Sequence, residues 1–158
     1  MLKRLLSVFA SLRSHDVRYV VIGGIAAIAH GVPRTTFDLD ILIEATLENA
    51  TRLVRALEAA GLGTTALTSP EDVLSREITI FSDRVRIDVQ TLTPGLLFED
   101  AWKRKVVMSY QGQEFFVASR EDLIASKRAA GRPRDLEDVR LLELPRRTDD
   151  GRPGTEKR

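Results

Sequence analysis

Asp38 and Asp40 stand one residue apart at the start of the apolar segment D-L-D-I-L-I-E, and this placement restricts the folds that are open to the chain. Side chains of a strand alternate between its two faces, so the two carboxylates share one face. The apolar residues between and after them point to the opposite face and need helices or a second sheet to cover them. The segment therefore predicts a strand in a sheet with one buried face and one acidic face.

A glycine pair, Gly23 and Gly24, lies upstream between two short apolar segments. The first, R-Y-V-V-I, predicts a buried strand, and the second, I-A-A-I-A-H-G, predicts a short helix that ends at Gly31. Glycine lets the backbone approach a ligand closely, and a helix N-terminus offers N–H donors to phosphate. A tight turn explains a glycine pair as well. Neither G-x-G-x-x-G nor G-x-x-x-x-G-K-[ST] is present.

A third carboxylate, Asp88, lies in the later segment R-V-R-I-D-V-Q, which predicts another strand. If this strand neighbours D-L-D-I-L-I-E, Asp88 joins Asp38 and Asp40 on one face. Three such carboxylates repel one another unless a cation neutralises them, and oxygen-only ligands suit Mg²⁺ or Mn²⁺. The D-x-D pair alone is more often explained by a capped strand end with a solvated Asp88. The glycine pair shifts the balance towards a metal and phosphate site.

The remaining segments complete an α/β (α+β) pattern. Helical spacing predicts helices over 2–14, 47–60, 119–130 and 134–144, and alternation predicts strands over 78–83 and 84–92 and a hairpin over 106–118. We expect one domain over residues 1–144, a mixed β-sheet flanked by helices with a small helical end at the C-terminus. Residues 145–158 contain almost no apolar side chain and predict a disordered tail.

Composition excludes several kinds of site. The chain of 158 residues has no cysteine and two histidines, which excludes disulfides and thiolate sites and leaves little room for a histidine-built metal site. Its net charge of +1 gives no whole-protein argument for nucleic acid. No apolar run approaches the roughly 20 residues that a membrane span needs, so we expect a cytoplasmic protein without a membrane partner.

The order of these features resembles the signature of the nucleotidyltransferase superfamily, which has the polymerase-β-like fold. That signature is a hydrophobic residue followed by G-[GS], a spacer, D-x-D and a third carboxylate on a later strand. The matching positions here are Gly23, Gly24, Asp38, Asp40 and Asp88. Many members have a serine after the first glycine to contact a phosphate. This chain has Gly24, so that contact would come from backbone N–H groups or from Arg34.

Within the superfamily, the chain looks most like the minimal nucleotidyltransferases and the AbiEii-like branch of type IV toxin–antitoxin proteins. That branch has a G-G-x-A beginning, an R-x-T-x-D-x-D core and, later, a lysine on a helix followed by R-D-x-x-D. The core begins here at Arg34 and Thr36. The later motif corresponds to Lys127, Arg134, Asp135 and Asp138.

The resemblance implies an enzyme that transfers a nucleoside monophosphate from a nucleoside triphosphate (NTP) to an acceptor. The acceptor could be an RNA end, a protein hydroxyl or a small molecule, and a toxin–antitoxin system is one setting that the resemblance suggests. By resemblance, Mg²⁺ or Mn²⁺ would be held by Asp38, Asp40 and Asp88, which would also be the catalytic residues. The nucleotide and its phosphates would be contacted by Gly23, Gly24, Arg34, Thr36 and Lys127.

The resemblance leaves the roles of the later motif open. Asp135 and Asp138 either orient Lys127 or the acceptor, or they are first-turn acids that favour the positive end of the last helix, which is the more common role. Lys127 is either a phosphate ligand or a solvated lysine of a helix surface.

Two other interpretations compete with catalysis. The chain could be a non-catalytic module of the same fold that binds a partner protein or RNA, although its intact carboxylates argue against lost activity. Its basic clusters, W-K-R-K and S-K-R-A-A-G-R-P-R, could bind RNA or be balanced surface. Trp102 and Phe98 could stack a base but are at helical spacing, which favours the core, and His30 is more often a packed histidine than a ligand.

Overall fold

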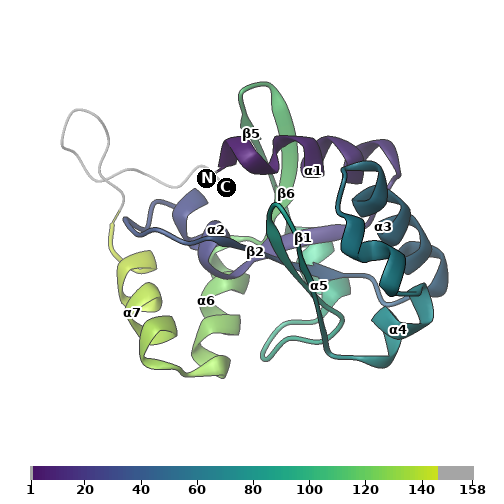
Figure 1. The fold of residues 1–158 in the computed structure, drawn as a ribbon. Helices are drawn as coiled ribbons and strands as arrows, with labels where there is room; N and C mark the ends of the chain where they lie inside the picture. Colours follow the sequence, from purple (N-terminus) through teal and green to yellow (C-terminus); the bar gives the residue numbers. More distant parts are fainter. Residues whose placement is uncertain (1, 146–158) are drawn as a thin grey trace.

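A six-stranded mixed sheet with helices on both sides forms the centre of the structure, a computed structural model that describes residues 2–145 (Figure 1). The strands are β1 (Tyr19–Ile22), β2 (Asp38–Ile43), β3 (Ile78–Ser82), β4 (Arg86–Gln90), β5 (Val106–Tyr110) and β6 (Gln113–Val117). The helices are α1 (Leu2–Ser14), α2 (Gly23–Ala29), α3 (Leu47–Ala59), α4 (Pro70–Ser75), α5 (Phe98–Arg104), α6 (Arg120–Ala130) and α7 (Pro133–Leu142), with a 3₁₀ turn η1 (Gly63–Leu67). The predicted fold class, a mixed sheet flanked by helices, is confirmed.

The strand order is β3-β4-β2-β1-β6-β5, which brings β2 beside β4 although α3, η1, α4 and β3 separate them along the chain. β2 pairs with β4 in parallel and with β1 antiparallel, and β6 pairs with β1 in parallel. Parallel neighbours need a long crossover connection, which the helices between β2 and β4 supply. The strand with the D-x-D pair therefore lies next to the strand that carries Asp88.

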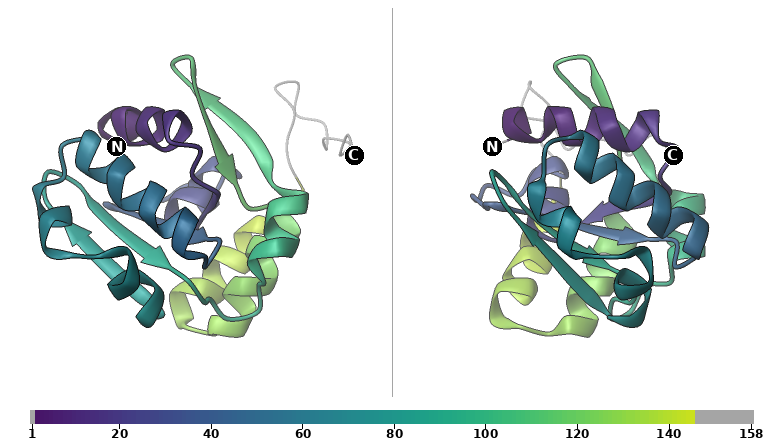
Figure 2. Two further views of the ribbon diagram at one scale, coloured as in Figure 1. Left: turned by 90° about the vertical axis from the view of Figure 1, so that its right-hand side faces the viewer. Right: turned by 45° about the vertical axis from the view of Figure 1, so that its right-hand side comes forward.

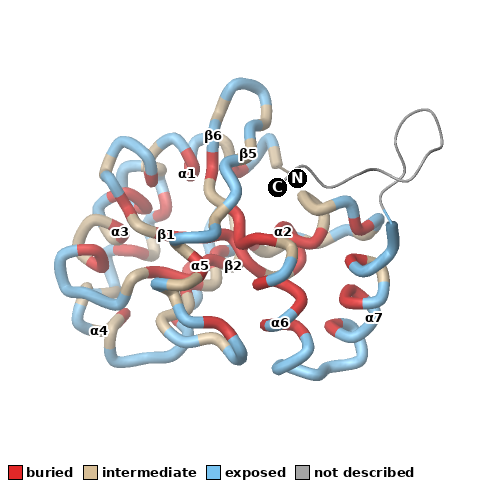
Figure 3. The backbone as a smooth tube through the Cα atoms, turned by 180° about the vertical axis from the view of Figure 1, so that it is seen from behind, coloured by how far each residue is buried: buried red, intermediate tan, exposed pale blue. Residues whose placement is uncertain are grey.

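Alternating side chains divide the hydrophobic core between the two faces of the sheet. On one face, the apolar side of β2 packs with α1 and α3, and Phe9 stacks on Phe115 with ring centroids 4.5 Å apart. On the other face, Val20 and Leu42 pack with Ala101 of α5. Two further views show α1 beside α3, and α6 beside α7 away from them (Figure 2). Burial is deepest around α2 and the central strands, and the β5–β6 hairpin tip is exposed (Figure 3).

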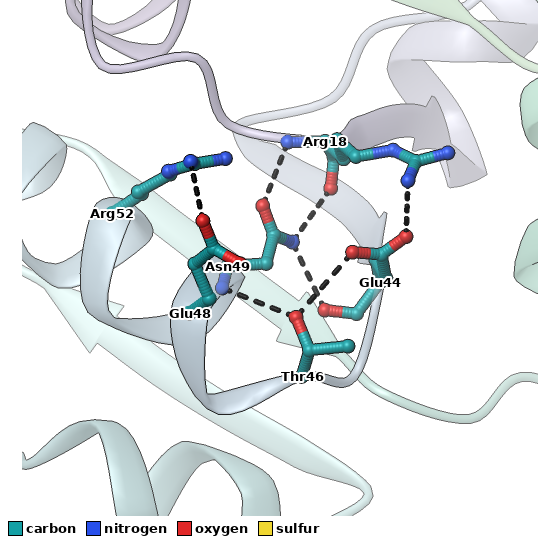
Figure 4. A network of polar contacts seen from close by, with 6 residues as sticks. All are labelled: Arg18, Glu44, Thr46, Glu48, Asn49 and Arg52. Atoms are coloured by element: carbon teal, nitrogen blue, oxygen red, sulfur yellow. Dashed lines mark hydrogen bonds and ion pairs between the residues drawn. The ribbon is translucent and has the colours of Figure 1, made fainter.

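A network of polar contacts fixes the ends of β1 and β2 that lie away from the two carboxylates (Figure 4). The buried Asn49 side chain accepts a hydrogen bond from the Arg18 N–H at 2.8 Å and donates to the carbonyls of Arg18 and Glu44, both at 2.9 Å. Thr46 caps α3 by accepting from the Asn49 N–H at 3.2 Å. These contacts tie the start of α3 to both strands.

The sequence patterns do not predict three short elements, η1, α4 and α5. Helix α4 begins with a capping box, in which the side chain of Ser69 and that of Asp72 each accept from the other residue's N–H, and Pro70 follows at the first helical position. Helix α5 has acids in its first turn and bases in its last. These end signals are present in the sequence, but six and seven residues are too few to show a helical period.

The helices within residues 2–145 include none that is long and apolar enough to cross a membrane. The predicted disordered tail over 145–158 lies, apart from Pro145, outside the described residues.

Candidate active site

Asp38, Asp40 and Asp88 lie on one face of the sheet, on two neighbouring strands. In the parallel register of β2 and β4, Asp38 is opposite Arg86 and Asp40 is opposite Asp88. The intervening Leu39 is fully buried on the other face. The structure thus brings together the three carboxylates whose strands the sequence could not pair with certainty.

Arg86 lies among these carboxylates. Its Nε and Nη2 donate to the Asp88 carboxylate at 2.9 and 3.2 Å, and its Nε is 3.7 Å from Asp38. Within residues 2–145, no three His, Cys, Asp or Glu side chains stand in an arrangement that could hold a metal ion. Since the guanidinium engages both oxygens of Asp88, that carboxylate would have to leave Arg86 before it could bind a cation. Sequence reasoning assigned Arg86 no role, although it precedes Asp88 by two residues on the same face.

The structure disfavours the charged form of the Asp40 carboxyl. Burial and, to a smaller extent, the charges of Asp88 and Asp38 together raise the pKa of the Asp40 carboxyl from 3.8 to about 7, against weaker opposing effects of Lys127 and Arg132. A nearby cation would stabilise the ionised carboxylate. Three carboxylates with only oxygen donors also match the ligands that Mg²⁺ and Mn²⁺ prefer. The donor chemistry therefore fits a divalent cation.

The glycine pair makes room for side chains of the site itself. Gly23 has a φ of +68°, and a Cβ built on it would lie 2.5 Å from Oδ2 of Asp40. A Cβ on Gly24 would lie 3.1 Å from the Cβ and Oγ1 of Thr36 and 3.3 Å from Nη2 of Arg34. Both glycines are the first residues of α2. Their contact with phosphate remains a prediction, whereas their role in admitting Asp40, Thr36 and Arg34 is visible in the structure.

We expect Gly23→Ala to destabilise the fold and to displace Asp40. The left-handed backbone costs an L-residue about 1–2 kcal/mol, and the new methyl group meets the Asp40 carboxylate. The matched control is Gly112→Ala, because Gly112 has a φ of +80° and a methyl group added there would meet no atom within 4 Å. Denaturant unfolding of both variants checks this. An equal loss of stability for the two would show that the contact with Asp40 adds nothing.

A buried ion cluster joins α6, α7 and the segment before β2. The Lys127 ammonium donates to the Asp138 carboxylate at 2.7 Å and lies 3.7 Å from Asp135. Arg34 donates to the same Asp138 oxygen at 2.5 Å. Lys127, Asp135 and Asp138 are 5%, 4% and 3% exposed. One carboxylate thus holds two predicted phosphate ligands in place.

The more common role considered for these two acids, that of a first-turn acid favouring the positive end of the last helix, is wrong for Asp138, whereas Asp135 does lie in the first turn of α7. Asp138 lies beyond the first turn of α7, and both carboxylates are buried in ion pairs. Burial opposes the charge on Asp135, but the hydrogen bond from Arg132 and the charges of Arg132 and Lys127 lower its pKa. The other interpretation, that these acids orient Lys127, agrees with the contacts. Lys127 is accordingly not a solvated surface lysine.

A cavity of about 510 Å³ lies between the carboxylates and the ion cluster. Every predicted site residue except Asp138 lines it. The wall from β2 and β4 carries three carboxylates and one guanidinium, those of Asp38, Asp40, Asp88 and Arg86. The opposite wall holds an excess of cations, contributed by Arg34, Lys127, Arg132 and Arg134. We call these the acidic wall and the basic wall. Sequence reasoning gave no role to Arg132 and none to Arg134 beyond its place in the motif.

The other candidate side chains have structural roles. The Nε2 atom of His30 is 2.8 Å from the Ala118 carbonyl oxygen, so His30 is a packed, hydrogen-bonded histidine as expected. Trp102, a residue of α5, is partly buried against the smaller core cluster that contains Val20, Leu42 and Ala101. Its ring contacts the side chains of Phe98, Phe116, Arg18 and Lys105. Trp102 and Phe98 are both partly buried and pack against the smaller core cluster, which agrees with a packing role for them.

Comparison with known proteins places this arrangement in a family. This chain is similar to the crystal structure of a candidate nucleotidyltransferase from Thermotoga maritima, with a TM-score of 0.57 and 19% sequence identity. The similar region spans 89% of this chain and 90% of the Thermotoga maritima chain. At that identity the likeness concerns the fold alone. No curated protein sequence matches the chain. Residues 2–151 match the family described as nucleotidyltransferase of unknown function (DUF6036), and the chain therefore belongs to this nucleotidyltransferase family.

Proposed function

We propose that the protein transfers a nucleoside monophosphate from an NTP to an acceptor hydroxyl, with a divalent cation held at the acidic wall. The observation that carries the proposal is the pair of oppositely charged walls around one cavity. An NTP with its cation has the matching polarity, because the metal needs carboxylates and the phosphate chain needs cations. Membership of a nucleotidyltransferase family supports the same reaction class.

The acidic wall would bind the cation through Asp38, Asp40 and Asp88. Bound Mg²⁺ or Mn²⁺ would lower the pKa of the acceptor hydroxyl and neutralise charge on the leaving pyrophosphate. The register of β2 and β4 fixes Asp40 opposite Asp88, so the two strands position these donors without help from a loop. Arg86 holds Asp88 in its present place and has to release it for the cation.

The basic wall would orient the phosphate chain for in-line attack. The acceptor oxygen forms a bond to the α-phosphorus, the bond from that phosphorus to the β-phosphate oxygen breaks, and pyrophosphate leaves. The acceptor proton passes to a carboxylate such as Asp88 or to solvent. Arg34 and Thr36 lie beside Gly24 and line the same cavity as the carboxylates, where they would meet the α-phosphate. Their charge and hydroxyl would position the reacting phosphorus.

The acceptor and the biological context rest on the sequence motifs. Placement in the AbiEii-like branch, and with it a toxin–antitoxin role, is our proposal from the R-x-T-x-D-x-D core and the R-D-x-x-D motif. An RNA end, a protein hydroxyl and a small molecule all offer the required hydroxyl. Incubation with each labelled NTP, Mg²⁺ and cell extract, followed by identification of the labelled product, distinguishes these acceptors.

A non-catalytic module is the second candidate, and the pairing of Arg86 with Asp88 favours it, because the pair leaves no preformed metal cluster within the described residues. RNA binding has less support. Most cations of the two basic clusters are paired within the protein: Arg104 with Asp122, Lys127 with Asp138, Arg128 with Glu143 and Arg132 with Asp135. Paired cations release few counterions on binding a nucleic acid, so a shallow salt dependence is expected.

Nucleotide binding is expected to depend on the divalent cation. Calorimetric titration with non-hydrolysable NTP analogues should show binding in Mg²⁺ that is lost in excess chelator, because the acidic wall repels an uncompensated triphosphate. The control is Glu48→Gln, which removes an exposed carboxylate on α3. Equal affinity with and without chelator would contradict the metal-dependent reaction and favour the non-catalytic module.

A further inference from the structure

We propose that Arg134, rather than Lys127, supplies the free positive charge that holds the terminal phosphates of the nucleotide. This inference rests on the proposed function and assigns the phosphate-binding role within the same cavity. Both residues line that cavity on its basic wall. They differ in whether their charge is already neutralised.

The charge of Lys127 is already paired with carboxylates of the protein. Its ammonium donates to Asp138 at 2.7 Å and has Asp135 at 3.7 Å, and only 5% of the residue is exposed. An ammonium between two carboxylates has little net field to offer a ligand. If Lys127 moved to meet a phosphate, Asp138 would lose one of its two partners inside the protein, which is costly for a buried charge. Lys127 therefore acts as a positioning residue for α7.

Arg134 is the opposite case. It is exposed at the start of α7, lines the cavity, and is the one cation of the basic wall without an ion-pair or hydrogen-bond partner among residues 2–145. Its guanidinium can present two parallel N–H donors to a phosphate, which an ammonium cannot. Pro133 at the first helical position and the buried Asp135 beside it fix the backbone from which Arg134 extends.

Arg132 adds to this subsite from two residues before Arg134. It donates to Asp135 at 2.7 Å, but 77% of its side chain is exposed, so its outer face is open to a ligand. Its charge is also felt by Asp40 across the cavity. The start of α7 therefore presents two guanidiniums opposite the carboxylates. A phosphate chain whose α-phosphate lies at the acidic wall would extend towards them.

The test compares phosphate-chain length with and without Arg134. Calorimetry in Mg²⁺ measures the affinity of two sets of ligands. One set is the α,β-methylene analogues of the four NTPs, and the other is the four unmodified nucleoside monophosphates. Arg134→Ala is expected to weaken triphosphate binding at least about tenfold, the size of one lost charge-assisted hydrogen bond, and to leave monophosphate binding nearly unchanged. Arg134→Lys should lose less, because it keeps a point charge.

The matched control is Arg140→Ala, which removes an exposed arginine from the same helix, where it pairs with Glu137 outside the cavity. Thermal melts confirm that each variant is folded. If the wild type binds triphosphates and Arg134→Ala binds them like Arg140→Ala, the inference is overturned and the proposed function stands. If the wild type binds none of the four triphosphates, both fall together.

Discussion

Asp40→Asn is expected to reduce nucleotide transfer at least about a hundredfold, the loss seen when one electrostatic contact to a transition state is removed. Asparagine keeps the shape of the side chain but removes a negative charge from the centre of the acidic wall. Asp40 is half-buried, lies against Gly23 and stands opposite Asp88 in the register of β2 and β4, so its charge is central to the acidic wall. Steady-state transfer assays on the folded variant measure the effect.

The same substitution is expected to stabilise the metal-free protein above pH 7. Because burial and two neighbouring carboxylates raise the pKa of Asp40 to about 7, the folded state binds a proton there more tightly than the unfolded chain does. The free energy of unfolding therefore falls as the pH rises from about 4 to about 7. Asparagine does not ionise, so Asp40→Asn should remove this fall, which is at most about 4 kcal/mol for a shift of about three pKa units.

Chemical denaturation between pH 4 and pH 8 in the presence of chelator checks the stability effect, with Glu58→Gln, an exposed carboxylate on α3, as the control. Near-normal transfer by folded Asp40→Asn would contradict the metal-site proposal and leave the non-catalytic module in its place. A pH dependence of stability equal to that of the wild type would show that Asp40 is not the group that makes the metal-free fold less stable.

Asp138→Asn is expected to destabilise the protein by about 3–5 kcal/mol, the usual result of removing one partner from a buried ion pair. The carboxylate accepts from Lys127 at 2.7 Å and from Arg34 at 2.5 Å, and only 3% of the residue is exposed. Asparagine leaves Arg34 without its carboxylate partner and Lys127 with only the more distant Asp135, 3.7 Å away. Nucleotide binding should weaken as well, since both cations line the cavity. Unfolding by denaturant and calorimetric titration measure the two effects.

The control for this variant is Glu137→Gln on the neighbouring position of α7. Glu137 pairs with Arg140 on the exposed side of the helix, where solvent screens the pair, and its loss should be small. A double-mutant cycle of Asp138→Asn with Lys127→Met should be strongly non-additive, because the two residues share one contact. Additive effects would mean that Asp138 does not act through Lys127.

The ion cluster explains why α6 and α7 belong to the site although they lie far along the chain from Asp38. Asp138 of α7 binds Lys127 of α6 and Arg34 of the segment that leads into β2. Without this carboxylate, α7 would lose its contact with Lys127 of α6 and its contact with Arg34 of the segment that leads into β2. Asp138 of the R-D-x-x-D motif therefore joins α6 and α7 to the segment that precedes β2.

Sequence patterns alone were sufficient for the features that depend on local order. Alternation placed Asp38 and Asp40 on one face of a strand, apolar spacing located the long helices, and the glycine pair marked the junction of β1 and α2, although Gly23 and Gly24 are already the first residues of the helix. These features follow from the period of a strand or helix, which neighbouring residues determine. The short helices α4 and α5 were not predicted, because a helix of six or seven residues completes fewer than two turns and its apolar spacing does not repeat.

Tertiary structure alone decided which charges meet. The parallel pairing of β2 with β4 placed Asp88 opposite Asp40, and it placed Arg86 beside Asp38. Arg86 also binds Asp88. Sequence spacing cannot distinguish a carboxylate that is available to a metal ion from one that is paired with an arginine. Likewise, Asp138 is separated from Arg34 by 104 positions, and its burial reversed the interpretation of a helix-end acid. The local sequence determines which face of its strand or helix a charged residue occupies. Which opposing charge it meets depends on packing between distant elements, and that pairing decides whether the group is free to bind a ligand.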